Sequence, residues 1–239
     1  MSKSANKQAN KNNKTLSSSG DVKNFLAKVN SLPTATQANA RLVFSLDATA
    51  SRQASWDQAC HLQTQMFLST QALGSLQIQL CYFRGFKQFF YSDWQTDSAG
   101  LLRLMSGIRC EAGATQLQKL LRHVVSENTI KPVKSVVFIG DAMEESRDIL
   151  CQLAGELGLL NIPLFIFQEG DDASARQCFQ EMARLSNGAY SHFDSSSIEQ
   201  LKELLKAVAV YCAGGLKALR DFSQHSNQQV KRLEQQLKF

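Results

Sequence analysis

Residues 41–47 read Arg41-Leu42-Val43-Phe44-Ser45-Leu46-Asp47, a short apolar run that ends at an aspartate. Such runs are typical of a strand buried on both faces of a parallel sheet. A second run, Ser135-Val136-Val137-Phe138-Ile139-Gly140, has the same character and is followed by Asp141. We therefore expect two buried strands, each with an aspartate at its carboxyl end.

Helical and extended patterns alternate along the rest of the chain. Apolar residues recur at helical spacing over residues 59–73, 101–108, 117–125, 149–157 (closed by Gly158), 176–185 and 198–208, and extended segments are expected at 76–83, 86–91, 162–167 and 189–193. Arg84-Gly85 separates the first two extended segments, which predicts a hairpin and hence one antiparallel strand. The alternation predicts an α/β fold with a doubly wound, mostly parallel sheet and helices on both faces.

Three regions are expected along the 239 residues. Residues 1–35 read as a disordered, basic tail rich in Asn, Lys and Ser. Residues 36–212 form the α/β domain. Residues 213–239 follow as a helical appendage, which either packs on the domain or binds a partner.

The formal net charge of +5 belongs to the two ends of the chain. Residues 1–20 hold four lysines and no acid, and residues 213–239 carry +3, which leaves −2 for the folded middle. A nucleic-acid-binding core normally shows a clustered positive face. We therefore expect no nucleic-acid partner, apart from a weak contact by the basic tail.

The sequence shows neither a transmembrane segment nor a pattern of disulfide-forming or zinc-binding cysteines. No stretch approaches the roughly 18 consecutive apolar residues of a transmembrane helix, and the N-terminus lacks the apolar segment of a secretory signal. We therefore expect no membrane association and a cytoplasmic location. The wide, irregular cysteine spacing predicts buried free thiols, not zinc ligands or disulfides, at six positions: Cys60, Cys81, Cys110, Cys151, Cys178 and Cys212.

Polar side chains gather in the loops expected at the carboxyl ends of strands. Asp47, Thr49 and Ser51 alternate along the first loop, so their side chains can point the same way. Thr115 opens a later helix, and Asp141 follows the second buried strand. Ligands of open α/β sheets bind at this edge. Two carboxylates and three hydroxyls form an all-oxygen set that suits Mg²⁺ first, with Mn²⁺ or Ca²⁺ as alternatives, and does not suit zinc.

Each loop also has a plainer interpretation. Asp-x-Thr-x-Ser after a strand is common in helix capping, and Thr115 and Asp141 would cap the helices that follow them. Glu144 and Glu145 are expected to face solvent, with a supporting role around the ion as the alternative. Acids at a helix start are the interpretation for three more carboxylates: Glu169, Asp171 and Asp172.

In order and spacing, these three loops resemble the metal ion-dependent adhesion site (MIDAS) of von Willebrand factor type A (VWA) domains, over about residues 40–210. The resemblance implies a Rossmann-like VWA fold. It also implies that the hydroxyls of Thr49 and Ser51 bind the ion directly, and that Thr115 binds it directly or through water. Asp47 and Asp141 would neutralise the ion.

The sequence departs from the family pattern in two places. Thr49 stands where the family has serine, and Gly140-Asp141-Ala142 stands where Thr-Asp-Gly is common. The implied function is metal-dependent protein–protein interaction without enzymatic activity, in which the cation bridges to a Glu or Asp side chain of a partner protein. The alternative is a metal-dependent hydrolase or phosphotransferase that uses Asp47 and Asp141. Haloacid dehalogenase-type enzymes need a second aspartate at the place of Thr49, which weakens that alternative.

Overall fold

The computed structural model describes residues 40–52, 76–193, 198–224, 226 and 228–237. Three features expected from the sequence lie outside these residues: the tail over residues 1–35, the helix over residues 59–73, and Cys60.

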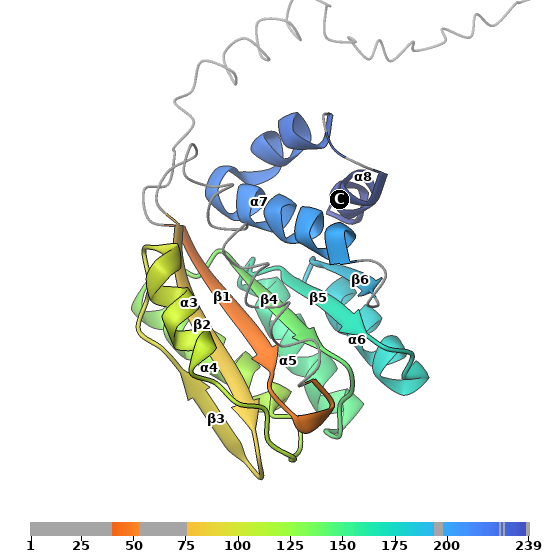
Figure 1. Ribbon diagram of the computed structural model, residues 1–239. Helices are drawn as coiled ribbons and strands as arrows, with labels where there is room; N and C mark the ends of the chain where they lie inside the picture. The colour runs from red at the N-terminus through yellow and green to blue at the C-terminus, as the bar shows by residue number, and fades with distance from the viewer. Residues whose placement is uncertain (1–39, 53–75, 194–197, 225, 227, 238–239) are drawn as a thin grey trace, which may run out of the picture. The chain divides into compact units, whose positions relative to one another are not determined.

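A six-stranded sheet forms the centre of the described part of the chain (Figure 1). Its strands stand in the order β3 (Gln88–Tyr91), β2 (Leu76–Arg84), β1 (Ala40–Asp47), β4 (Ser135–Gly140), β5 (Leu164–Glu169) and β6 (Ala189–Phe193). Neighbouring strands are parallel except β2 and β3, which form the antiparallel hairpin. The predicted doubly wound, mostly parallel sheet with one antiparallel strand is confirmed.

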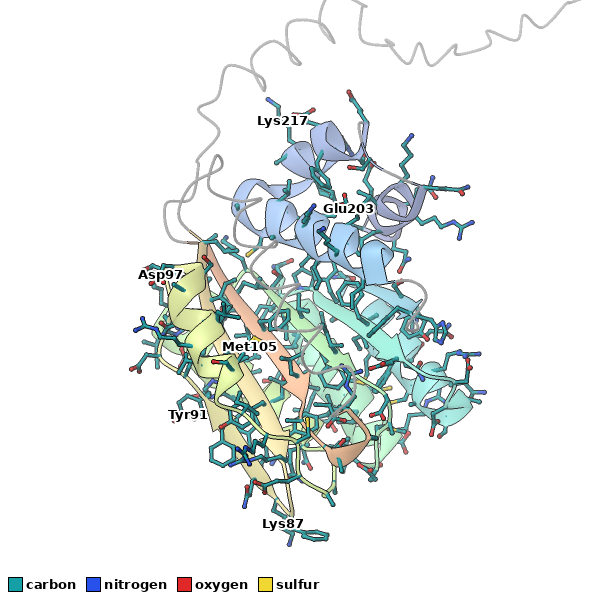
Figure 2. All side chains as sticks on the ribbon, in the orientation of Figure 1. Lys87, Tyr91, Asp97, Met105, Glu203 and Lys217 are labelled. Atoms are coloured by element: carbon teal, nitrogen blue, oxygen red, sulfur yellow. The ribbon has the colours of Figure 1, made fainter. Side chains whose placement is uncertain are left out.

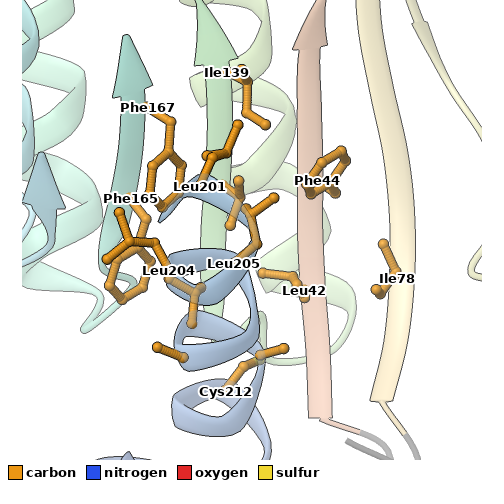
Figure 3. Close-up of a cluster of buried hydrophobic side chains, with 14 of the residues drawn as sticks. Leu42, Phe44, Ile78, Ile139, Phe165, Phe167, Leu201, Leu204, Leu205 and Cys212 are labelled. Atoms are coloured by element: carbon orange, nitrogen blue, oxygen red, sulfur yellow. The ribbon is translucent and has the colours of Figure 1, made fainter. Parts of the chain in front are cut away.

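Helices cover both faces of this sheet. One face carries α4 (Leu117–Ile130), α5 (Arg147–Leu159) and α6 (Ala173–Leu185), and the other carries α3 (Ser98–Ser106) and α7 (Ile198–Gln224). The period-two alternation of a strand explains the division, because Leu42 and Phe44 of β1 pack in the cluster that contains α7, whereas Val43 packs with α4 to α6. Figure 3 shows Leu201 and Leu205 of α7 against the sheet.

Residues after the helix predicted over residues 198–208 add to the apolar cluster that contains Leu42 and Phe44. α7 is kinked at Gly215, where φ is 68° and the backbone leaves the helical region. After the kink, Leu219 of α7 and Val230 and Leu233 of α8 (Gln228–Gln236) are buried in the same cluster as Leu42. In the described part of the chain, no helix has both the length and the apolar composition needed to cross a membrane.

The sequence pattern predicted that the helix ends at Gly158, but α5 runs one residue further. The helix continues to Leu159, and the chain turns at Asn161, whose φ is 56°. A Cβ atom at position 158 would lie only 2.2 Å from the carbonyl oxygen of Leu185 at the end of α6. Gly158 therefore marks a close approach of two helices instead of a helix end.

The outer edge of β6 is covered by one side chain from α8. Gln236 accepts a hydrogen bond from the backbone N–H of Tyr190 at 3.0 Å and donates one to its carbonyl oxygen at 3.4 Å. This amide thus satisfies groups that an edge strand would otherwise expose. Tyr190 and Gln236 also line two cavities of about 340 and 380 Å³, and none of the predicted site residues lines either cavity.

The described cysteines are all free, as predicted, but not all are buried. Cys81, Cys178 and Cys212 are buried, whereas Cys110 and Cys151 are partly exposed. Burial raises the pKa of the Cys178 and Cys212 thiols to about 12. These two thiols therefore stay protonated and behave as small apolar side chains.

Candidate functional site

The predicted site residues follow strands whose carboxyl ends point the same way. β1 and β4 are parallel neighbours with Leu46 opposite Ile139, so the loops that begin at Asp47 and Asp141 leave the same edge of the sheet. The first loop (orange) lies at the lower end of the sheet in Figure 1. Lys87, at the turn between β2 and β3, marks the same end in Figure 2.

The first loop holds its three polar residues close together. Oδ1 of Asp47 accepts a hydrogen bond from the backbone N–H of Thr49 at 2.8 Å. The chain then enters the short 3-10 helix η1 (Ala50–Arg52), which brings the hydroxyl oxygens of Thr49 and Ser51 to 3.1 Å from each other. Asp47 and Thr49 are buried and Ser51 is exposed. The loop therefore presents two adjacent hydroxyls beside a buried carboxylate.

Asp47 is electrostatically unusual. Its side chain is fully buried, and Oδ2 has no hydrogen-bond partner among the described residues. The pKa of this carboxyl is raised from 3.8 to about 7. Burial is the largest cause, the negative charge of Asp141 also raises the pKa, and the hydrogen bonds from Thr49 and the charge of Arg52 lower it. Burial and like charge penalise the ionised form, so a positive charge bound at this place would be favourable.

Arg52, which no sequence pattern indicated, joins the first loop to the end of β5. Its fully buried guanidinium forms an ion pair with Glu169 at the end of β5. The interpretation of Glu169 as an acid at a helix start is therefore wrong, whereas Asp172 does cap α6, because its Oδ1 accepts a backbone N–H of the first turn at 2.7 Å. Asp171, directly before this cap, forms an exposed ion pair with Arg176. Arg52 and Glu169 are 117 positions apart, which is too far for a local sequence pattern to reveal their contact.

Thr115 belongs to a second group of side chains. Its hydroxyl lies 2.6 Å from Oε2 of Glu144 and 2.5 Å from Oε2 of Glu145. The backbone N–H of Thr115 also donates to Glu144 at 2.8 Å. Glu144 is exposed, as expected, and Glu145 is partly buried, and both carboxylates also form hydrogen bonds with the hydroxyl of Thr115.

The capping interpretations of Thr115 and Asp141 are also wrong. The N-cap of α4 is Gln116, which makes no side-chain capping bond, and the Thr115 hydroxyl is used by the glutamates. The N-cap of α5 is Ser146, five positions beyond Asp141. Neither Thr115 nor Asp141 therefore serves as a helix cap.

Backbone contacts tie the loop before α4 to the first loop. The N–H of Glu111 donates to the carbonyl of Ala48 at 3.0 Å, and Thr49 forms a parallel bridge with Glu111. A Cβ atom at Gly113 would lie 1.9 Å from the carbonyl oxygen of Gly85, so the hairpin turn can come this close only to a glycine. These contacts place the segment that leads to Thr115 along the Asp47 loop. Within the described residues, however, no hydrogen bond joins Thr115 to the other four predicted site residues.

The departure at Gly140 has a packing reason. A Cβ atom at this position would lie 2.4 Å from the ring of Phe138, two residues earlier on β4. A threonine at position 140 would therefore require the buried Phe138 ring to move. The carboxylate of Asp141, which follows directly, is partly exposed.

The candidate donor set is made of few charged groups. In the described part of the chain, no group of three or more His, Cys, Asp or Glu is placed to hold a metal ion. The predicted set differs from such a group because it combines two carboxylates with three hydroxyls. These are hard oxygen donors, and the unpartnered oxygen of Asp47 is the observation that fits them to a divalent cation.

Comparisons with known proteins identify the fold. No family model and no curated protein sequence matches the chain. Among solved structures, the SpRpn10 VWA domain is similar at 12% identity, over 70% of this chain and 95% of that domain, with a TM-score of 0.57. The manganese-loaded Plasmodium vivax TRAP protein is similar at 14% identity, over 70% and 73% of the two chains, with a TM-score of 0.53.

A third similar structure has a metal-occupied MIDAS. It is proximal thread matrix protein 1 from the mussel byssus, with zinc in its MIDAS motif, at 14% identity over 73% of this chain and 46% of that chain, with a TM-score of 0.54. At this level of identity, structural likeness establishes the fold and does not establish function. The fold described above agrees with this likeness in its strand order, its one antiparallel strand and its two helical layers. The chain therefore has the fold of von Willebrand factor type A domains.

Proposed function

We propose that this chain is a metal-dependent protein-interaction module of the cytoplasm. Five oxygen-bearing side chains at one edge of the sheet would hold a single divalent cation: Asp47, Thr49, Ser51, Thr115 and Asp141. Mg²⁺ is the first choice, with Mn²⁺ or Ca²⁺ as alternatives, because all the donors are hard oxygens. The partner would be another protein that offers a Glu or Asp side chain.

The observation that carries this proposal is the state of Asp47. A carboxylate oxygen that is buried without a hydrogen bond among the described residues costs stability, about 1–3 kcal/mol or more for a charged group. Burial raises the pKa of this carboxyl to about 7, because the loss of solvation outweighs the hydrogen bonds from Thr49 and the charge of Arg52. A cation beside Asp47 would supply the missing interaction.

Each donor would have a distinct part. The hydroxyl oxygens of Thr49 and Ser51, 3.1 Å apart, offer lone pairs to one ion, while Asp47 and Asp141 provide negative charge. A cation held by only two carboxylates keeps a net positive character, and so it attracts a further carboxylate from outside. Similar structures with zinc or manganese support a divalent cation in this fold.

Calorimetric titration with Mg²⁺ tests the proposal. Wild-type protein should bind the ion, Asp47→Ala should abolish the binding heat, and Thr115→Ala should reduce it. Asp93→Ala is the matched control, because Asp93 is exposed and follows the antiparallel strand β3, towards the opposite end of the sheet. Equal binding by wild type and Asp47→Ala would remove this site from consideration.

We further propose that the chain is not an enzyme. A metal-dependent hydrolase or phosphotransferase using Asp47 and Asp141 is the alternative. Thr115 has a hydroxyl beside two carboxylates, as a nucleophile beside a general base would, but its side chain is only 3% exposed and so is closed to a substrate. We expect no Mg²⁺-dependent release of phosphate from p-nitrophenyl phosphate. Release that Asp47→Ala abolishes would favour the enzyme.

A further inference from the structure

The outer edge of β6 is closed by one side chain where a further strand could stand. β6 is the last strand of the sheet in the described part of the chain (Figure 1). The amide of Gln236 pairs with both the backbone N–H and the carbonyl oxygen of Tyr190, as the peptide group of a neighbouring strand would. Backbone groups on an edge strand alternate in direction, so those of His192 face outward as well. A polypeptide backbone could therefore take the place of the Gln236 amide.

Two cavities flank this contact. One, of about 340 Å³, is lined by Leu204 of α7 and Leu233 of α8, and the other, of about 380 Å³, is lined by Ala183 of α6. Tyr190 and Gln236 line both cavities. Because α6 and α7 cover opposite faces of the sheet, the two cavities lie on opposite sides of its edge.

A strand added beside β6 would use both cavities. Neighbouring side chains of a strand point to opposite faces of the sheet. A segment paired with Tyr190 would therefore direct one side chain towards α7 and α8 and the next towards α6. Main-chain hydrogen bonds at a sheet edge, together with pockets for alternate side chains, are the features by which proteins bind extended peptides.

The charge of the cavity walls indicates which side chains fit. Arg232 lines the first cavity and Arg184 lines the second, and no acidic side chain among the described residues lines either one. Both arginines are exposed, so an incoming segment can reach them. Arg184 forms an ion pair with Glu181 at the surface of α6, and Glu181 is not part of the cavity wall. Since a guanidinium group binds a carboxylate through paired hydrogen bonds, acidic side chains fit both cavities.

We propose that the β6 edge binds an extended, acidic segment of a partner protein by strand addition. The backbone of the segment replaces the Gln236 amide on Tyr190, and two neighbouring acidic side chains lie beside Arg232 and Arg184. Gln236 is then a competitor within the chain that weakens this binding. The site uses none of the five predicted cation ligands and is therefore independent of the proposed cation site.

A fluorescein-labelled peptide, Thr-Val-Glu-Glu-Val-Thr with an amidated C-terminus, tests the proposal by fluorescence anisotropy in EDTA and about 0.15 M salt. Its two glutamates point to opposite faces of a strand. Wild-type protein should bind it about fivefold more tightly than the peptide with glutamine at both glutamate positions, because two exposed ion pairs are gained. Asp47→Ala should bind it as wild type does, so failure of the proposed cation site leaves this result unchanged.

Two pairs of variants separate the roles of the edge and of the charge. Gln236→Ala removes the competing amide and should strengthen binding about fivefold, whereas Gln235→Ala, at an exposed position that lines neither cavity, should not change it. Arg232→Glu should weaken binding about fivefold or more. Lys231→Glu makes the same charge change at an exposed position outside both cavities and should alter affinity less than about twofold.

Amide hydrogen exchange measured by NMR locates the bound peptide. In Gln236→Ala, the N–H of Tyr190 loses its acceptor and should exchange faster, and saturating peptide should slow its exchange again. Binding that leaves the Tyr190 amide unprotected would overturn strand addition. Equal binding of the glutamate and glutamine peptides would overturn the acidic occupant, and no binding by Gln236→Ala would overturn the whole proposal. Dimerisation of Gln236→Ala without peptide would assign the edge to a second copy of the chain and overturn it too.

Discussion

In the loop after β1, a buried oxygen of Asp47 has no hydrogen-bond partner among the described residues, whereas in the loop before α4 the single hydroxyl of Thr115 is shared by two carboxylates. The first loop has an acceptor without a donor, and the second has two acceptors for one donor. Glu144 is exposed and Glu145 is partly exposed, so water can reach their oxygens, whereas the oxygen of Asp47 is buried. Since buried polar groups in native proteins are nearly always paired, the first loop alone holds an unpaired group that a bound cation would satisfy.

The largest effect is expected at Asp47, because its carboxyl has the most strongly perturbed environment of the site. Burial raises its pKa from 3.8 to about 7, so between these values the folded protein holds a proton that the unfolded chain has lost. Stability from this group is therefore present below about pH 4 and is lost as pH rises towards 7. Three pKa units correspond to a loss on the order of 4 kcal/mol.

Asp47→Asn tests this directly, because asparagine keeps the oxygen that accepts from Thr49 and does not titrate. In urea unfolding with EDTA, the free energy of unfolding of the variant minus that of wild type should increase from pH 4 to pH 8. Saturating Mg²⁺ should reduce this difference by stabilising wild type alone. A difference that does not change with pH would show that Asp47 has an ordinary pKa.

The first loop and the fold could be predicted from the sequence because their signals are local. Alternating strand and helix patterns determine which faces of the sheet are covered, and the spacing of Asp47, Thr49 and Ser51 lies within five residues. The hairpin is likewise fixed by a turn beside its strands. A resemblance to VWA domains then supplied the order of the three loops, which periodicity alone cannot give.

Thr115 was predicted as a site residue, but its contacts with Glu144 and Glu145 could not be predicted, because they join residues far apart in the sequence. Thr115 meets Glu144 and Glu145 from 29 and 30 positions away, and Arg52 meets Glu169 from 117 positions away. A glutamate in a polar loop looks solvated in sequence, since nothing local indicates that a hydroxyl of another loop will lie beside it. The partners become visible only when the sheet has placed both loops at one edge.

A smaller effect is expected from Thr115→Val, which removes the shared hydroxyl and keeps the shape of the side chain. Both glutamates then lose their common donor, and only the backbone N–H of Thr115 still donates to Glu144. Without metal, the free energy of unfolding should fall by about 1–2 kcal/mol, because a hydrogen bond to a charged group is lost. Urea unfolding in EDTA measures this change. Thr115→Ser, which restores the hydroxyl, is the control and should recover most of the loss.

The smallest effect is expected where the sequence departs from the family pattern, at Thr49. Thr49→Ser keeps the hydroxyl that meets Ser51 and the backbone bridge to Glu111, and it removes one buried methyl group. The cost in unfolding free energy should be below about 1 kcal/mol, and affinity for Mg²⁺ should change less than about twofold.

Thr49→Val separates the role of the hydroxyl from that of the side-chain volume, because valine fills the same space without the oxygen. If the hydroxyl of Thr49 serves only to hydrogen-bond Ser51, valine and serine should both leave Mg²⁺ affinity near the wild-type value. If the hydroxyl is a ligand, Thr49→Val should weaken Mg²⁺ binding by about tenfold or more, whereas Thr49→Ser should not. Loss of even a supporting interaction around a metal ion lowers affinity by about this factor. Calorimetric titration of the two variants side by side therefore decides whether the first loop binds the ion through its hydroxyls or only through Asp47.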